Sequence, residues 1–369
     1  MTTYSSVYYP HTTIQSEELL RQSLLLWDRV DVIVPEAGFS VTTGLPPIQA
    51  AACELLVRPR VPSAEEKQSV DVVVQGLLTD GVPSWLVESL TVDSGDGNRP
   101  SPSQRHPDYY LVYPEKLLHN TWARLRGHGV ARWFGEFGDY GVPPALGLLL
   151  MSCLADACAG RTLHKITDRP EAYRNLFGLM SSALGGTVVR MPSTCGVSDA
   201  IDRLVTVSTR VANVRNTPMS RLVDLRRKEE KEKSGHLRSL RHKYLDEVTA
   251  HAKALLEPGL TLGDKRELEN EYKQRVERDL VELKRSLGMA RNDVLLSKEA
   301  ATTAVAAAAA VTGPVGAAVS AALKGVSVGA LLATGVKYAR ARRHALSSHS
   351  VSWLFLARRR TRDLLLCRR

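Results

Sequence analysis

The sequence predicts a mixed α/β N-terminal domain followed by an all-α C-terminal half. Over roughly the first 200 residues, short β-branched or aromatic runs alternate with segments of helical spacing, which is typical of α/β layers. From Ser198 onward the strand-like runs stop, and long charged amphipathic segments follow. The 369 residues are enough for two or three domains of about 100–200 residues each. A hydrophobic content of 44% and a charged content of 24% exclude a wholly disordered chain.

The first strand, helix and strand form one predicted βαβ unit. Residues 7–9 are β-prone and stop at Pro10, and residues 30–34 are a β-branched run that stops at Pro35. Between them, residues 16–27 carry leucines and a tryptophan at helical spacing. Two strands joined by one short helix predict parallel pairing with a right-handed crossover.

Strands and helices continue to alternate through the N-terminal domain, which we place at residues 1–214. Further strands are expected at residues 109–113, 163–166 and 187–191. Further helices are expected at residues 63–77, 115–126, 143–159 and 170–184. A long polar loop is expected at residues 93–107. The glycine-rich stretch 134–141 is interpreted as a turn, because Glu136 and Asp139 would repel a phosphate there.

Residues 215–298 predict a charged antiparallel helical hairpin. Apolar residues recur at steps of three and four in both arms, from Leu237 to Leu255 and from Leu268 to Val294. The beginning of the first arm, residues 226–233, has no apolar side chain and is expected to lie in water. The hairpin either packs on the rest of the protein or stands free as a coiled coil.

Residues 299–336 form an Ala/Gly-rich segment in which Lys324 is the single charge after Glu299. Residues 315–336 could cross a bilayer core of about 30 Å, but a central lysine costs about 2.5–3.5 kcal/mol on insertion. Small residues at every fourth position favour close packing between helices instead. The predicted packing residues are Ala317, Ala321, Gly325, Gly329 and Ala333. A membrane-inserting or membrane-lying hairpin is the alternative.

Residues 337–369 form a basic tail with one lysine and nine arginines against Asp363 alone. This balance of +9 accounts for nearly all of the chain's net charge of +10. The tail could lie on an anionic membrane surface, bind nucleic acid, or serve solubility and pairing with acidic residues of the helical arms. Its position behind an apolar segment favours the membrane over nucleic acid. The residues assigned to anionic-surface binding are Arg340, Arg342, Arg343, Arg358, Arg359, Arg360 and Arg362.

The sequence identifies no catalytic motif. It contains no phosphate-binding loop, no nucleophile elbow, and no His or Cys spacing of a zinc site, so we expect no cofactor and no metal. One weak candidate site is Thr167 and Asp168, which follow a predicted strand at the place where α/β sheets hold functional side chains. A helix N-cap is the alternative role for this pair.

The five cysteines and the N-terminus bear on the compartment. The cysteines are odd in number and scattered, and Cys153 and Cys158 lie in an apolar helical stretch, so reduced core thiols are expected. The N-terminus has no basic region followed by an apolar run, as a secretory signal would have. We therefore expect a cytoplasmic protein, with a peripheral or inserted position at the inner membrane as the alternative.

Several short pieces resemble an uncharacterised bacterial domain-of-unknown-function family. These pieces are Tyr8-Tyr9-Pro10, residues 24–35, residues 148–155, Thr167-Asp168, residues 226–244 and residues 352–355. The resemblance implies an architecture and an intracellular bacterial setting, but no activity.

These observations lead to three functional hypotheses. The first is a non-enzymatic interaction protein that assembles with itself or a protein partner through its helices, at the inner membrane surface in one version. The second is an enzyme of unknown reaction with a cleft in the N-terminal domain, and the third is a nucleic-acid-binding protein that acts through its tail. Convergence of His11, His164, Asp168 and Glu136 in one place would favour the enzyme.

Overall fold

The computed structural model describes residues 4–79, 81–83, 109–135, 138–160, 163–169, 172, 194–295, 336 and 338–358. The side chains of residues 194–200, 202–203 and 290–295 are not part of this description. The chain divides into two compact units, Met1–Ala200 and Ile201–Arg369. The boundary lies inside a helix near residue 200, before the end that we predicted for the N-terminal domain. We describe each unit by itself.

A four-stranded parallel sheet forms the centre of the N-terminal unit, with the strand order β3-β2-β1-β7. Its strands are β1 (Ser5–Tyr9), β2 (Arg29–Ile33), β3 (Val57–Arg60) and β7 (His164–Thr167). β1 pairs in parallel with β2 on one side and with β7 on the other. The predicted βαβ unit is confirmed, because α1 (Glu17–Leu26) connects β1 to β2.

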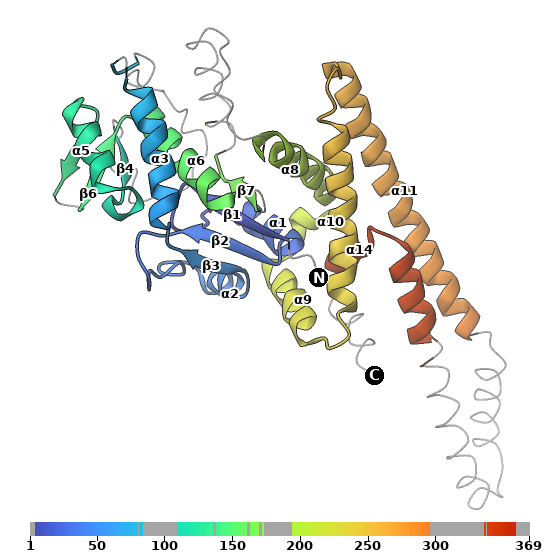
Figure 1. The fold of residues 1–369 in the computed structure, drawn as a ribbon. Helices are drawn as coiled ribbons and strands as arrows, with labels where there is room; N and C mark the ends of the chain where they lie inside the picture. Colours follow the sequence, from blue (N-terminus) through green and yellow to red (C-terminus); the bar gives the residue numbers. More distant parts are fainter. Residues whose placement is uncertain are drawn as a thin grey trace, which may run out of the picture. The chain divides into compact units, whose positions relative to one another are not determined.

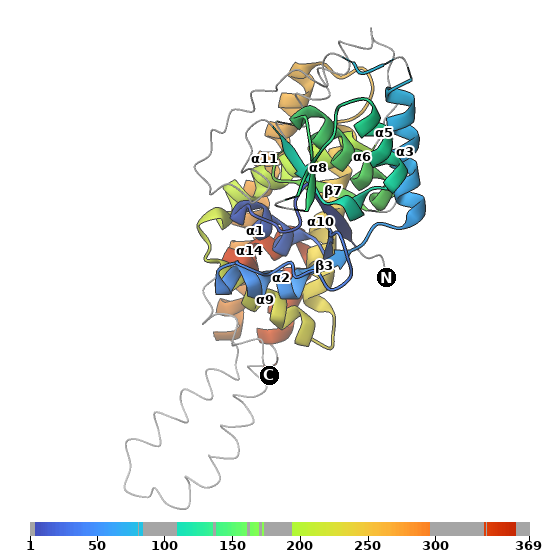
Figure 2. The same cartoon turned by 90° about the vertical axis from the view of Figure 1, so that its left-hand side faces the viewer.

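Helices cover both faces of this sheet (Figure 1). α1 and α2 (Pro47–Leu56) lie on one face, and α3 (Ala64–Leu77) and α6 (Pro144–Ala159) lie on the other, as Figure 2 also shows. Side chains at alternating positions of a strand point to opposite faces, so Val7 and Tyr9 contribute to the core on the α6 side. The mixed α/β fold predicted for this region is therefore present.

α6 is the most apolar helix of the unit and almost all of its side chains are buried. Pro144 stands in its first turn, where the missing N–H group costs no hydrogen bond, and Gly160 ends it with a φ of 55°. Cys153 and Cys158 on this helix are buried free thiols, as predicted.

A second, antiparallel sheet has the strand order β4-β6-β5. Its strands are β4 (Tyr110–Val112), β5 (Arg132–Phe134) and β6 (Asp139–Val142). The 3₁₀ helix η2 (Pro114–Lys116) and α5 (His119–Gly127) follow β4. The stretch 134–141, interpreted as a turn, contains the end of β5 and most of β6, and Phe134 pairs with Asp139 in this β-hairpin. The strand and helix expected at residues 187–191 and 170–184, and the loop at 93–107, lie outside the described residues, apart from Ala172.

The second unit is helical in the part that the structure describes. Its α-helices are α8 (Thr194–Val211), α9 (Met219–Lys231), α10 (His236–Ala254), α11 (Leu262–Leu295) and α14 (Ser352–Arg358). A 3₁₀ helix, η3 (Val214–Asn216), lies between α8 and α9.

α10 and α11 form the predicted antiparallel hairpin (Figure 1). The ring of His251 on α10 lies 4.7 Å from the ring of Tyr272 on α11, and the Tyr272 hydroxyl lies 2.8 Å from the hydroxyl of Ser208 on α8. Most described residues of the two apolar stripes are buried within this unit, between Leu240 and Leu255 and between Tyr272 and Leu287, and α14 packs against both helices. The stripes therefore build the core of the chain itself.

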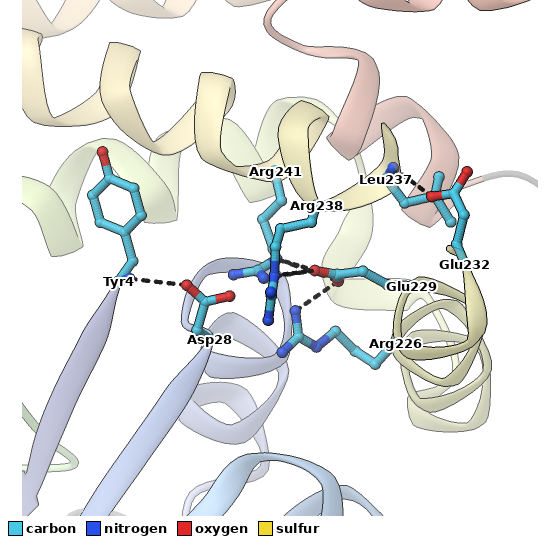
Figure 3. Close-up of polar contacts among 8 residues, drawn as sticks. All are labelled: Tyr4, Asp28, Arg226, Glu229, Glu232, Leu237, Arg238 and Arg241. Carbon is cyan, nitrogen blue, oxygen red and sulfur yellow. Dashed lines mark hydrogen bonds and ion pairs between the residues drawn. The ribbon is translucent and has the colours of Figure 1, made fainter. Parts of the chain in front are cut away.

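The start of the first arm lies only partly in water. Arg226 and Glu229 are buried, contrary to our prediction for residues 226–233, whereas Arg227, Glu230, Lys231 and Lys233 are exposed. Figure 3 shows Arg226, Arg238 and Arg241 converging on Glu229. The shortest bonds to its carboxylate are 2.7 Å from Arg226 and 2.6 Å from Arg241, whose side chain is 0% exposed. Paired charges can be buried where each has its counterion, so two residues of this all-polar segment lie in the interior. Residues 232–235 separate α9 from α10 and break the arm into two helices.

Residues 338–348 are helical, and α14 follows with Trp353 fully buried. Lys243 on α10 donates to the carbonyl oxygens of Ser347 and Ser348, at 2.9 and 3.2 Å. Much of the predicted basic tail is therefore part of the helical unit. Among the described residues, no helix combines the length and apolarity that crossing a membrane requires.

Candidate functional site

The carboxyl ends of β1 and β7 lie side by side at one edge of the parallel sheet. From β1 the chain proceeds to β2 and β3 on one side, and it returns through α3 and α6 to β7 on the other side. The direction of winding therefore reverses between β1 and β7. Open α/β sheets bind ligands outside the carboxyl ends of their strands at such a reversal. The polar residues at this edge are therefore the first candidates for a functional site.

Asp168 links the ends of these two strands. The Tyr8 hydroxyl in β1 donates a 2.9 Å hydrogen bond to Oδ2 of Asp168, the residue that follows β7. The neighbouring Thr167 has a local role, because its Oγ1 accepts a 3.1 Å hydrogen bond from the backbone N–H of Arg169. Of the two predicted site residues, Asp168 therefore faces a distant partner and Thr167 shapes the turn.

Two further loops reach the same edge. The Tyr113 hydroxyl, just after β4, forms a hydrogen bond with Thr12 in the loop after β1. The Tyr113 ring also meets Phe39, in the loop after β2, with 5.9 Å between ring centroids. These contacts bring η2 and its Lys116 to the site, and Nζ of Lys116 lies 5.7 Å from the centre of the Tyr113 ring.

His11 follows β1 and is held neutral in the interior. Its residue surface is 7% exposed. Burial, together with the positive charges of Arg169 and Lys116, lowers the pKa of His11 to about 3. The buried Nε2 atom of His11 has no hydrogen-bond partner among the described residues.

Lys116 and Asp139 have shifted ionisation equilibria as well. Burial lowers the pKa of Lys116 to about 8, against the attraction of Asp139. Burial, together with the nearby charge of Glu115, raises the pKa of Asp139 to about 6, and Lys116 opposes this shift. Both groups therefore exchange protons nearer to neutral pH than ordinary lysines and aspartates do. Groups of this kind gather in functional sites.

Asp168 also takes a proton more readily than usual. Burial raises its pKa, while the hydrogen bond from Tyr8 and the charge of Arg169 lower it in part. Oδ1 of Asp168 and Oδ1 of Asp139 are buried and have no hydrogen-bond partner within the described part of the chain. Buried polar atoms normally have a partner, so three unsatisfied atoms near one edge indicate a place for a ligand or water.

The remaining predicted residues do not gather here. His164 begins β7, and its ring lies 5.1 Å from the Trp27 ring, near the opposite end of the strands. Glu136 and the helix-packing residues Ala317, Ala321, Gly325, Gly329 and Ala333 lie outside the described residues. The described side chains include no group of three His, Cys, Asp or Glu able to hold a metal ion.

The basic residues divide into three groups. Arg340, Arg343 and Arg358 are exposed. Arg342 is buried, at 4% exposed, and so does not belong to an exposed anion-binding surface as we predicted. Arg359, Arg360 and Arg362 are beyond the described residues. The buried residue alternates with exposed ones on one helix because a helix in contact with protein has an inner and an outer face.

From the sequence, His11 was considered only as a residue whose convergence with Asp168 would favour an enzyme, and Arg169, Lys116 and Asp139 were not indicated as site residues. Arg169 follows the end of β7 closely, so the rule that identified Asp168 could have found it. Lys116 lies in η2, which follows β4, and Asp139 begins β6 of the antiparallel sheet, whose hairpin we interpreted as a turn. No local pattern connects that sheet with the end of β1.

The comparisons with known proteins identify no relative. No family model matches the chain. No curated protein and no solved structure matches it either. The resemblance to an uncharacterised bacterial family remains a hypothesis.

Proposed function

We propose that the N-terminal α/β unit binds a small polar molecule at the carboxyl ends of β1 and β7. The observation that carries this proposal is the set of buried, unsatisfied polar atoms beside the Tyr8–Asp168 hydrogen bond. Leaving such an atom without a partner costs about 1–3 kcal/mol, and a bound ligand would remove that cost. The proposal develops the hypothesis of an enzyme with a cleft in the N-terminal domain, since such an enzyme would bind its substrate at this edge of the sheet. The proposal assigns no reaction.

A second observation supports the location. The groups with shifted pKa values come from the ends of β1 and β7 and from the second sheet, and their charges influence one another. A core polar network would be expected to satisfy its own hydrogen bonds. This one leaves acceptors unsatisfied at the place where α/β sheets bind ligands, which favours binding over a purely structural role.

The test is a ligand screen by thermal unfolding of the full-length protein. Asp168→Asn removes the carboxylate at the site, whereas Glu54→Gln makes the same chemical change at an exposed position of α2. A compound that stabilises the wild type and Glu54→Gln equally, but Asp168→Asn to a clearly different extent, would support the proposal. If Asp168→Asn responds to every stabilising compound as the wild type does, the proposal is wrong.

Assembly through the helical half is the second candidate function. The apolar stripes of α10 and α11, which suggested assembly, pack within the helical unit. α11 also exposes two apolar side chains, Val281 at 61% and Met289 at 52%. Glu277, Arg278, Glu282 and Arg285 surround them, so the face combines apolar and charged groups as partner surfaces do. We propose this face and residues 299–336 as the assembly surface. The version at an anionic membrane would use the exposed Arg340, Arg343 and Arg358.

Sizing by light scattering tests the second candidate. Met289→Glu and Gly325→Leu should each reduce the molar mass in solution, because one charges the surface and the other separates closely packed helices. Glu257→Gln, at an exposed site after α10, is the control and should leave the mass unchanged. A wild-type protein that is monomeric at all tested concentrations would contradict self-assembly.

A further inference from the structure

The ligand class can be narrowed by the charges at the site. Arg169 and Lys116 both act on His11 with positive charge. Neither cation forms an ion pair with a carboxylate of the described residues, although Asp168 and Asp139 are near enough to influence them. Lys116 is 3% exposed and faces the Tyr113 ring. A buried lysine without a direct counterion is costly, and an anion from solution would offset that cost.

The unsatisfied atoms fit the same ligand class. Nε2 of His11 is buried and has no partner in the described part of the chain, and a protonated imidazole would donate from that atom to an anion. Asp139 and Asp168 have carboxyl groups that accept protons more readily than usual. In their protonated forms their free Oδ1 positions could donate too. A bound cation would be repelled by Arg169 and Lys116, so the site favours an anion.

We propose that the site binds the anionic group of a small molecule, a phosphate or a carboxylate, against Arg169, Lys116 and Nε2 of His11. This inference rests on the proposed function of the N-terminal unit and names its ligand class. Arg169 follows β7, His11 follows β1 and Lys116 belongs to η2, so three separate segments supply the contacts. Such convergence of segments allows an anion to be surrounded, which one surface cation does not achieve.

Proton uptake should accompany anion binding. A negative charge at the site raises the pKa of every group that faces it, so the bound state holds more protons than the free state. Affinity should therefore rise as the pH falls, and all titrating groups act in this direction. His11 faces Arg169 and Lys116, and Lys116 also faces Asp139 and Cys158. Asp139 faces Glu115 as well. Asp168 faces Tyr8, Tyr110 and Arg169.

Sulfate and acetate are suitable probes for the full-length protein. Sulfate has the tetrahedral shape of a phosphate and does not titrate in this pH range, so its pH dependence reports the protein alone. Acetate represents the carboxylate source. Isothermal titration with both probes at about pH 7 shows which anion binds more tightly. Repeating the sulfate titration at about pH 5 shows how affinity depends on pH, and we expect the affinity for sulfate to rise by about tenfold or more. Histidine ring nitrogen shifts, with His11→Gln for assignment, should show proton uptake by His11.

Two variants and one matched control locate the binding. Arg169→Gln and Lys116→Met should each weaken sulfate or acetate binding by about tenfold or more. Arg126→Gln removes the same charge from an exposed position of α5 and should leave binding unchanged. Circular dichroism and urea unfolding check that each variant is folded. A variant that fails to fold is replaced by Arg169→Lys, which keeps the charge but not the planar group and should show an intermediate affinity.

The outcomes separate this inference from the proposed function. If neither probe binds the wild type, or if binding is insensitive to both variants or weakens as the pH falls, the anion inference is wrong. If at the same time a neutral compound stabilises the wild type but not Asp168→Asn, small-molecule binding at this edge is supported although the anion inference is wrong. Sulfate binding that is lost in Arg169→Gln and strengthened at low pH supports both.

Discussion

The Tyr8 hydroxyl donates a 2.9 Å hydrogen bond to Asp168, across 160 positions of the sequence. Both groups are strongly desolvated, and burial raises the pKa of Asp168 as well as that of Tyr8. The hydrogen bond opposes this effect on Asp168, because a donor facing the carboxylate stabilises its ionised form and lowers its pKa. It connects the fold of the parallel sheet with the candidate site.

Tyr8→Phe should lower the free energy of unfolding by about 1.5–3 kcal/mol, because a hydrogen bond to a charged group is lost in the interior. Urea unfolding at neutral pH measures this change. Tyr140→Phe is the control, since the Tyr140 ring stacks on Trp122 and its hydroxyl has no hydrogen bond to a described residue. A midpoint for Tyr8→Phe equal to that of the wild type would show that the bond adds nothing to stability.

Gly147→Ala should destabilise the N-terminal unit. An added Cβ at Gly147 on α6 would overlap the Tyr110 side chain of β4, including the atoms nearest to the backbone. Overpacking of this kind costs about 1–3 kcal/mol. Gly76→Ala on α3 makes the same substitution in open space and should stabilise by about 0.4–1 kcal/mol. Thermal unfolding of the two variants should show shifts of opposite sign, and equal shifts would contradict the close approach of α6 and β4.

Leu283→Ala should open a cavity in the helical unit. Leu283 on α11 is 0% exposed, so its truncation is expected to cost about 2–5 kcal/mol. Val281→Ala, two residues earlier on the outer face, should change stability by less than about 0.5 kcal/mol. Urea unfolding followed by helical circular dichroism compares them. A Leu283→Ala midpoint unmoved from the wild type would contradict the packed hairpin.

Much of the fold was predictable because local periodicity coincided with burial. The βαβ unit was recognised from its β-branched runs and the leucine spacing of α1, α6 was recognised as an apolar helical stretch, and α3 was also expected as a helix. β3 was missed because its four residues include Arg58, Pro59 and Arg60. As the outermost strand of the order β3-β2-β1-β7 it tolerates a proline and charged side chains, which a central strand would not.

The site was predictable only where it adjoins a strand end. Asp168 was selected by its position, but its partner Tyr8 resembles any aromatic residue of a buried strand. Lys116 and Asp139 reach the site through the antiparallel sheet, and pairing between distant segments leaves no local signal. The burial of Glu229 was missed for a related reason, because its partner Arg241 is twelve positions away on another helix.

Glu229→Gln should destabilise the helical unit strongly. The carboxylate accepts hydrogen bonds from Arg226 and Arg241, and loss of its charge leaves buried guanidinium groups without this counterion (Figure 3). Breaking one side of a buried ion pair costs about 3–5 kcal/mol. Glu230→Gln, at the next and exposed position of α9, should be nearly neutral. Equal urea midpoints for the two variants would show that the cluster contributes no more than a surface pair.

The stability of the wild type should fall in acid because of His11. Its pKa is about 3 in the folded protein and 6.5 in the unfolded chain, so the unfolded state binds more protons between these values. Stability from this group is complete above the unfolded pKa and is lost progressively as the pH falls toward the folded pKa. Between neutral pH and about pH 4.5 the loss amounts to roughly 2–3 kcal/mol.

His11→Gln isolates this contribution, because glutamine does not titrate. The difference in unfolding free energy between wild type and His11→Gln should shrink by roughly 2–3 kcal/mol from neutral pH to about pH 4.5. His119→Gln, at an exposed position of α5, makes the same substitution away from the site and serves as the control. Asp139 has the opposite effect on stability, because its raised pKa favours the folded state as the pH falls through about 6. Since Asp139 is present in all three proteins, its contribution largely cancels in the differences between their unfolding free energies. Urea unfolding at the two pH values gives both differences, and a His11→Gln difference that does not change with pH would mean that His11 is not held neutral in the folded protein.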